Sequence, residues 1–112
     1  MSAPQKRILL DSNLPVDLRH CLSPYPVETA RYAGLHLLDD GPLLDAMAGK
    51  FEVLVTADLS IAYQQNLVGR PVALAVLSAR SNRLSDLLPL MPELLRAIAS
   101  INPGEVREIT AP

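Results

Sequence analysis

The chain has 112 residues, of which 49% are hydrophobic, a single cysteine and a formal net charge of −2. These values predict one domain with one core, and they exclude a disulfide framework, a thiolate metal site and a global basic field for nucleic acid. No apolar run is long enough for a membrane span and no signal-peptide core is present, so we expect a cytoplasmic protein without a membrane partner.

The first predicted element is a strand over residues 7–11, after a polar start at residues 1–6 that we expect to be frayed. Its three consecutive aliphatic residues, at positions 8–10, are typical of a strand buried on both faces. Asp11 and Asn13 follow at once, and residues just past the carboxyl end of a parallel strand point into the crevice where ligands bind. The structural alternative is that Asn13 caps the next helix while Asp11 supports the turn.

Helices and strands alternate along the rest of the chain. The predicted elements are a helix at 14–22, a weak strand at 27–30, a helix at 40–48, a strand at 51–56, a helix at 59–67, a strand at 72–77, a helical segment at 84–98 and an edge strand at 105–109. Pro89 and Pro92 should kink the last helical segment or make it restart near Pro92. This alternation predicts a three-layer α/β domain with a mostly parallel sheet of four to five strands and helices on both faces.

Two predicted strands end alike, in Leu10-Asp11 and in Thr56-Ala57-Asp58. With a strand order of 2-1-3-4, these strands are neighbours and their carboxyl ends flank the topological switch point. Asp11 and Asp58 would then point into one crevice, where two carboxylates repel each other and a hard divalent cation relieves the repulsion. The pattern therefore predicts a sparse Mg²⁺ site, because Mg²⁺ keeps most of its waters and needs only one or two protein carboxylates.

Three residues near these strand ends have a structural interpretation beside the functional one. Asp40 could reach the same crevice, but it also stands where an ordinary helix N-cap would. Asp58 is well placed to cap the helix beginning at residue 59, and Thr56 could be only a β-branched strand residue. These alternatives stay open at the level of sequence.

A polar loop after the fourth strand carries Arg80, Asn82 and Arg83. It lies at the same sheet edge as the strand-end carboxylates. Two arginines near such a site suit the positioning of a phosphate group, although exposed loop arginines are commonly just solvated. We expect this loop to contact nucleic acid.

Two segments carry a family resemblance: Ile8-Leu9-Leu10-Asp11-Ser12-Asn13-Leu14-Pro15 and Val53-Leu54-Val55-Thr56-Ala57-Asp58. They resemble the small PIN-like proteins of the DUF5615 group, which is similar to the PIN-domain toxins of bacterial toxin–antitoxin pairs. The resemblance runs from about residue 7 to residue 109. It implies a PIN-like sheet, a metal-dependent ribonuclease ancestry and a small antitoxin partner. Asp11 and Asp58 match the two acidic strand-end residues, and Asp40 is a looser match to an acidic residue that opens the middle helix.

Three positions depart from the pattern of these relatives. Ser12 and Pro42 stand where acidic residues are common, and Ser60 stands where Asp or Asn is common. We therefore expect the site to hold fewer carboxylates than the sites of these relatives. The resemblance thus supports the fold more strongly than the activity.

The leading hypothesis is a Mg²⁺- or Mn²⁺-dependent endoribonuclease acting on RNA as a toxin component. Asp11 and Asp58 would hold the metal and Asp40 would complete the site. The neutral residues Asn13, Thr56 and Ser60 would position ligands and water. The alternative is a PIN-like fold that no longer cleaves and serves as a nucleic-acid-binding or protein-interaction module.

The segment 84–98 carries more leucine than one packing stripe needs. An exposed part of it would provide an association surface. We therefore expect either a homodimer or a complex with a small antitoxin-like protein.

Overall fold

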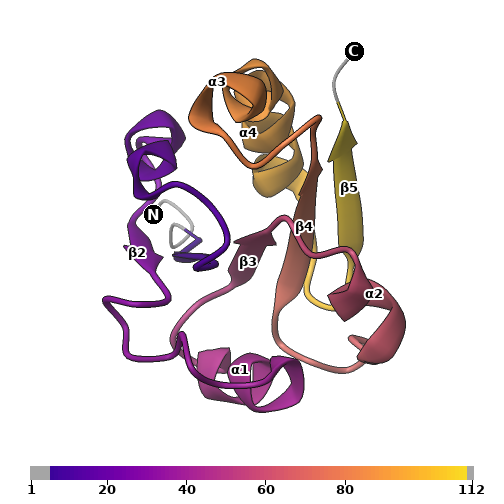
Figure 1. Cartoon of the computed structure of the whole chain (residues 1–112). Helices are drawn as coiled ribbons and strands as arrows, with labels where there is room; N and C mark the ends of the chain where they lie inside the picture. Colours follow the sequence, from indigo (N-terminus) through magenta and orange to yellow (C-terminus); the bar gives the residue numbers. More distant parts are fainter. Residues whose placement is uncertain (1–5, 111–112) are drawn as a thin grey trace.

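The computed structural model of the chain, which describes residues 6–110, is a three-layer α/β domain (Figure 1). Its sheet has five strands in the order β2-β1-β3-β4-β5, and every neighbouring pair is parallel. The strands are β1 (Ile8–Leu10), β2 (Val27–Thr29), β3 (Val53–Thr56), β4 (Ala73–Ser78) and β5 (Val106–Thr110). The predicted fold class and the predicted order of the first four strands are both confirmed.

Helices cover both faces of this sheet (Figure 1). One face carries the 3₁₀ helix η1 (Val16–Leu22), α3 (Leu84–Leu87), the 3₁₀ turn η2 (Leu88–Leu90) and α4 (Met91–Ser100), and the other carries α1 (Asp40–Met47) and α2 (Ser60–Gln64). Strand side chains alternate between the two layers, so Leu10 packs with the first group and Leu9 with the second. Burial on both faces explains why the strands read as unbroken aliphatic runs. No helix in residues 6–110 is long and apolar enough to cross a membrane.

The first helix differs from its prediction. An α-helix was expected at residues 14–22, but the observed element is a 3₁₀ helix that begins at Val16. The Leu14 N–H donates to the Asp11 carbonyl at 3.1 Å, which closes a turn, and Pro15 then adopts an extended conformation with ψ of 135°. Helical geometry therefore starts only after Pro15. Leu18 and Leu22 of this element are nevertheless fully buried in the core.

The proline-interrupted segment behaves as predicted. The helix α3 ends at Leu87, and α4 restarts at Met91 with Pro92 in its first turn, where the missing N–H removes no helical hydrogen bond. The expected leucine-rich association surface is small, since Leu88 (43% exposed) is the one leucine of the segment that is largely accessible. Most of this leucine content belongs to the core.

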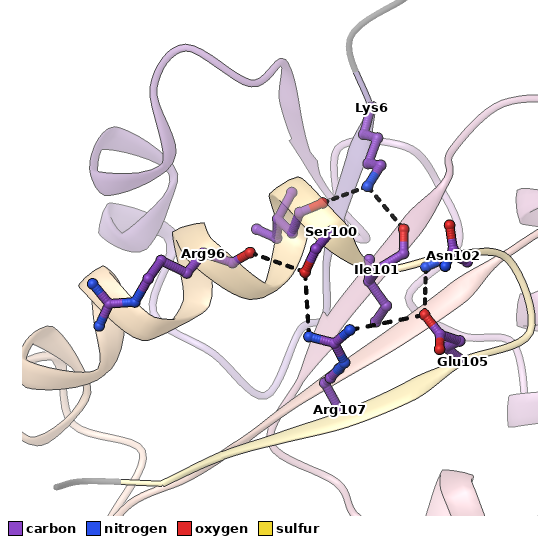
Figure 2. Close-up of polar contacts among 8 residues, drawn as sticks. Lys6, Arg96, Ser100, Ile101, Asn102, Glu105 and Arg107 are labelled. Atoms are coloured by element: carbon purple, nitrogen blue, oxygen red, sulfur yellow. Dashed lines mark hydrogen bonds and ion pairs between the residues drawn. The ribbon is translucent and has the colours of Figure 1, made fainter.

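Lys6 is held in place, contrary to the expectation of a frayed start, and residues 1–5 lie outside the described part of the chain. Its ammonium group donates to the carbonyls of Ile98 and Ile101, the last at 2.8 Å, where α4 ends (Figure 2). A lysine at this position satisfies carbonyls that have no partner within the helix. Burial, and then the nearby Arg107 charge, hold the pKa of Lys6 below its ordinary value.

The amino ends of β1 and β3 are joined by an ion pair between Arg7 and Glu52. The Arg7 Nη2 lies 2.6 Å from one Glu52 carboxylate oxygen, and the Arg7 Nε and backbone N–H both donate to the other. The Glu52 N–H donates in return to the Arg7 carbonyl at 2.9 Å. The hydrogen bonds from Arg7 hold the pKa of Glu52 below its usual value. This cluster defines where the pairing of β1 with β3 begins.

We predict that Glu52→Gln lowers the free energy of unfolding at neutral pH and removes part of the chain's acid sensitivity. Because the folded-state pKa of Glu52 is depressed, its contribution is present above its unfolded-state pKa and is lost as the pH falls through the lowered folded value. The difference from the natural chain should therefore shrink in acid. Urea unfolding between pH 7 and pH 3 measures this, with Glu93→Gln, which removes an exposed pair within α4, as the control. An equal difference at every pH would contradict the prediction.

Candidate functional site

The carboxyl ends of β1 and β3 are connected by the side chain of Thr56, the last residue of β3. Thr56 is fully buried. Its hydroxyl donates to the Asp11 carboxylate at 2.7 Å and accepts the Asp58 backbone N–H at 3.1 Å and the Asn13 amide at 3.3 Å. One donated and two accepted hydrogen bonds use the whole capacity of a hydroxyl group. Thr56 is thus more than a β-branched strand residue, because one atom joins both predicted acidic positions.

Asn13 does not cap the helix that follows it, so the capping interpretation is wrong. No side-chain hydrogen bond caps η1. The Asn13 side chain instead lies across the end of β3, where its carbonyl oxygen accepts the Ala57 N–H at 3.3 Å and its amide donates to Thr56. The turn interpretation of Asp11 holds, since one Asp11 carboxylate oxygen accepts the Ser12 N–H at 2.8 Å. The loop after β1 is therefore fastened directly to the neighbouring strand end.

Asp58 has a structural role at the start of α2. One of its carboxylate oxygens accepts both the backbone N–H of Ser60, at 3.0 Å, and the Ser60 hydroxyl. This bond satisfies the N–H of the first residue of α2. The N-cap position itself belongs to Leu59, so Asp58 supports the start of the helix from one residue before the cap. The second carboxylate oxygen has no hydrogen-bond donor within residues 6–110. Asp58 is half-buried, so this oxygen remains available to a ligand.

Asp40 is the first residue of α1, and the N-cap interpretation is wrong because the capping position belongs to Asp39. Burial raises the pKa of Asp40, and the negative charges of Asp58 and Asp11 raise it further. Asp40 therefore lies within electrostatic reach of both strand-end carboxylates. The negative charges of the other two carboxylates thus make ionisation of Asp40 less favourable.

The donor chemistry of this cluster fits a hard divalent cation. Its oxygens come from carboxylates and hydroxyls, the ligands that Mg²⁺ and Mn²⁺ prefer. Within residues 6–110, however, no three acidic, histidine or cysteine side chains are close enough together to enclose a metal ion. The arrangement thus suits a cation that takes one or two protein carboxylates and keeps its waters, rather than a closed coordination shell.

The two arginines of the loop predicted to contact nucleic acid line a different cavity from the one that contains Asp11. Arg80, Asn82 and Arg83 are exposed. The two arginines line a polar hollow of about 440 Å³ together with Ser81, Ser85 and Asp86. Neither Asp11 nor Asp58 lines that hollow. The structure therefore brings Arg80 and Arg83 together, but in a cavity that does not include the strand-end carboxylates.

A second cavity, of about 310 Å³, includes Asp11 and a cation that sequence reasoning missed. It is lined by Asp11, Ser12, Leu14, Val16, Thr29 and Arg31. Arg31 follows β2, which pairs with β1 so that Thr29 lies opposite Leu10. The rule that singled out Asp11 and Asp58, that residues just past parallel strands meet at one edge, applies equally to the second strand. Because the sequence indicates this strand only weakly, the rule did not single out Arg31.

Comparison of the chain with protein-family models, with curated proteins and with solved structures finds no match.

We predict that Thr56→Val destabilises the fold by about 1–3 kcal/mol, the cost of leaving buried polar groups without a partner. Valine keeps the shape of the side chain but removes the hydroxyl that Asp11, Asn13 and the Asp58 N–H use. Thr56→Ser is the matched control, because it keeps the hydroxyl and loses one methyl group. Urea unfolding compares the three proteins. A valine variant as stable as the natural chain would show that the hydroxyl does not hold the strand ends together.

Proposed function

We propose that this chain is a metal-dependent endoribonuclease of the PIN-like type. The observation that carries the proposal is that the Thr56 hydroxyl links Asp11 and the Asp58 backbone at the carboxyl ends of two neighbouring parallel strands, with Asp40 within electrostatic reach of both. Ligand sites of open α/β sheets lie at such an edge. Mutual repulsion of the carboxylates favours a bound cation there.

Asp11 and Asp58, with Asp40 beside them, are the residues that would hold Mg²⁺ or Mn²⁺. When bound, such an ion supplies a Lewis acid for a phosphate oxygen and lowers the pKa of a water molecule. The chain's own groups orient the ligands. Thr56 holds one Asp11 oxygen and the Ser12 N–H holds the other, while Ser60 holds one oxygen of Asp58. These contacts leave the carboxylates with little rotational freedom to lose when a ligand binds.

The small number of carboxylates determines how strong we expect this activity to be. Ser12 and Pro42 are exposed and provide no negative charge where acidic residues would help to hold a cation. Fewer carboxylates mean weaker affinity for a hard cation. Slow cleavage that depends steeply on metal concentration is therefore the expected behaviour.

A second candidate function, a module that binds without cleaving, has its own supporting observations. Both Asp11 oxygens already accept internal hydrogen bonds, and Asp58 accepts the first N–H of α2, so each has a structural use that needs no metal. No closed metal-binding group occurs in residues 6–110. The toxin role and the small antitoxin partner, by contrast, rest only on the family resemblance.

The test is RNA cleavage across a Mn²⁺ titration for the natural chain, for Asp58→Asn and for the double variant Ser12→Glu, Pro42→Glu. We expect slow cleavage by the natural chain, none by Asp58→Asn, and faster cleavage at lower metal by the double variant. Circular dichroism controls for folding, because Asp58 also accepts the first N–H of α2. If neither the natural chain nor the double variant cleaves RNA at saturating metal, while both still bind it, the nuclease proposal is wrong and the chain is a binding module.

A further inference from the structure

We propose that the cavity beside Asp11 is a subsite for one nucleotide unit of the RNA chain, with Arg31 holding its phosphate group. The inference rests on the proposed function, because it assigns an RNA subsite next to the proposed metal ligands. It also replaces the loop at residues 80–83 as the main phosphate contact.

The geometry of β1 and β2 places Arg31 at the candidate site. Thr29 pairs with Leu10, and the Ala30 N–H donates to the Leu10 carbonyl at 2.8 Å. The two strands therefore end level with each other, and the chain after each one borders the same cavity. Asp11 enters this cavity from β1 and Arg31 from β2.

Within residues 6–110, Arg31 has no side-chain partner that would explain its position. Four other arginines form ion pairs with carboxylates: Arg7, Arg70, Arg96 and Arg107. Arg31 makes no side-chain hydrogen bond or ion pair with any residue from 6 to 110, and it is exposed. Among the arginines without such a pair it alone lines the cavity that contains Asp11. Its guanidinium presents a planar set of donors that matches phosphate oxygens.

The remaining walls of the cavity fit the other parts of a nucleotide. The Thr29 oxygen accepts the Tyr32 N–H at 3.1 Å, and within the described chain its own O–H has no acceptor, so it can donate to a ligand. Two further lining residues are apolar, Leu14 and Val16, and Val16 is 49% exposed. A volume of about 310 Å³ is at the small end for ligand sites, so the cavity suits one nucleotide unit.

Charge determines how such a unit would lie. The Asp11 carboxylate repels a phosphate group and the Arg31 guanidinium attracts it, so the phosphate belongs on the Arg31 side with the ribose and base against Val16. A phosphate held there is adjacent to the one that would reach Asp11. Arg31 is therefore a positioning residue for the RNA chain rather than a group that acts on the reacting atoms.

The experiment measures binding of a fluorescein-labelled single-stranded RNA in Mg²⁺ by fluorescence anisotropy at several salt concentrations, with gels to show that the RNA stays intact. We expect Arg31→Gln to weaken binding about tenfold, the loss of one charge-assisted contact. The slope of log affinity against log salt should fall by roughly 0.7. Where cleavage is measurable, KM should rise while kcat stays unchanged.

Two matched variants make the result specific. Lys50→Gln removes the same charge beyond the amino end of β3, at the opposite edge of the sheet, and should bind RNA nearly as well as the natural chain. Arg80→Gln tests the loop at residues 80–83 and should have a smaller effect than Arg31→Gln. If the natural chain binds RNA but Arg31→Gln and Lys50→Gln bind it with the same affinity and the same salt dependence, the proposed subsite is wrong. The proposed function would not be affected by that result. Absence of RNA binding by the natural chain would overturn the proposed function and the subsite with it.

Discussion

The register between β1 and β3 is the constraint on which the candidate site depends. At the amino ends, the Arg7–Glu52 pair sets where the strands begin to pair, and Ile8 to Leu10 then lie opposite Val53 to Val55. At the carboxyl ends the same register brings Asp11 to the Thr56 hydroxyl. A slip of one residue would turn every side chain of β1 to the other face of the sheet and would carry the Asp11 carboxylate away from Thr56. The ion pair at one edge thus supports the polar cluster at the other.

Burial of β1 explains why charged side chains begin only at Asp11, directly after the strand. All three residues of β1 are fully buried, so a charged side chain can appear only where the strand emerges at the sheet edge. Asp11 is half-buried at this edge, and its oxygens are satisfied by Thr56 and Ser12. The same layer that covers Leu9 brings the first residue of α1, Asp40, near both strand-end carboxylates. The packing of the core therefore decides which acidic residues lie at this edge of the sheet.

Sequence reasoning could predict the features that depend on local pattern and on the general geometry of parallel sheets. Unbroken aliphatic runs located the strands, and the rule for the carboxyl ends of parallel strands was enough to bring Asp11 and Asp58 to one edge. The break in the last helical segment followed from Pro89 and Pro92 in the same way.

Features that depend on the packing of distant segments could not be predicted. Asn13 was expected at a helix N-terminus, but its partners are Thr56 and Ala57, more than 40 residues away in the chain. The late start of η1, at Val16, depends on the turn that Asp11 and Leu14 close and on the extended Pro15. Arg31 follows β2, whose sequence Val-Glu-Thr lacks the buried aliphatic run that marks β1. Only the pairing of β2 with β1 shows that Arg31 borders the Asp11 cavity.

The central claim is that the strand-end carboxylates form a cation site. The most direct measurement is a crystal structure of the chain soaked in Mn²⁺, with the metal located by anomalous scattering, beside the same experiment on Asp58→Asn. We predict one anomalous peak with an oxygen of Asp11 or Asp58 within about 2.2 Å, the usual metal–oxygen distance, and no peak there in the variant. A soaked crystal with no peak at this edge, or a peak that persists in Asp58→Asn without contact to Asp11, would contradict the claim.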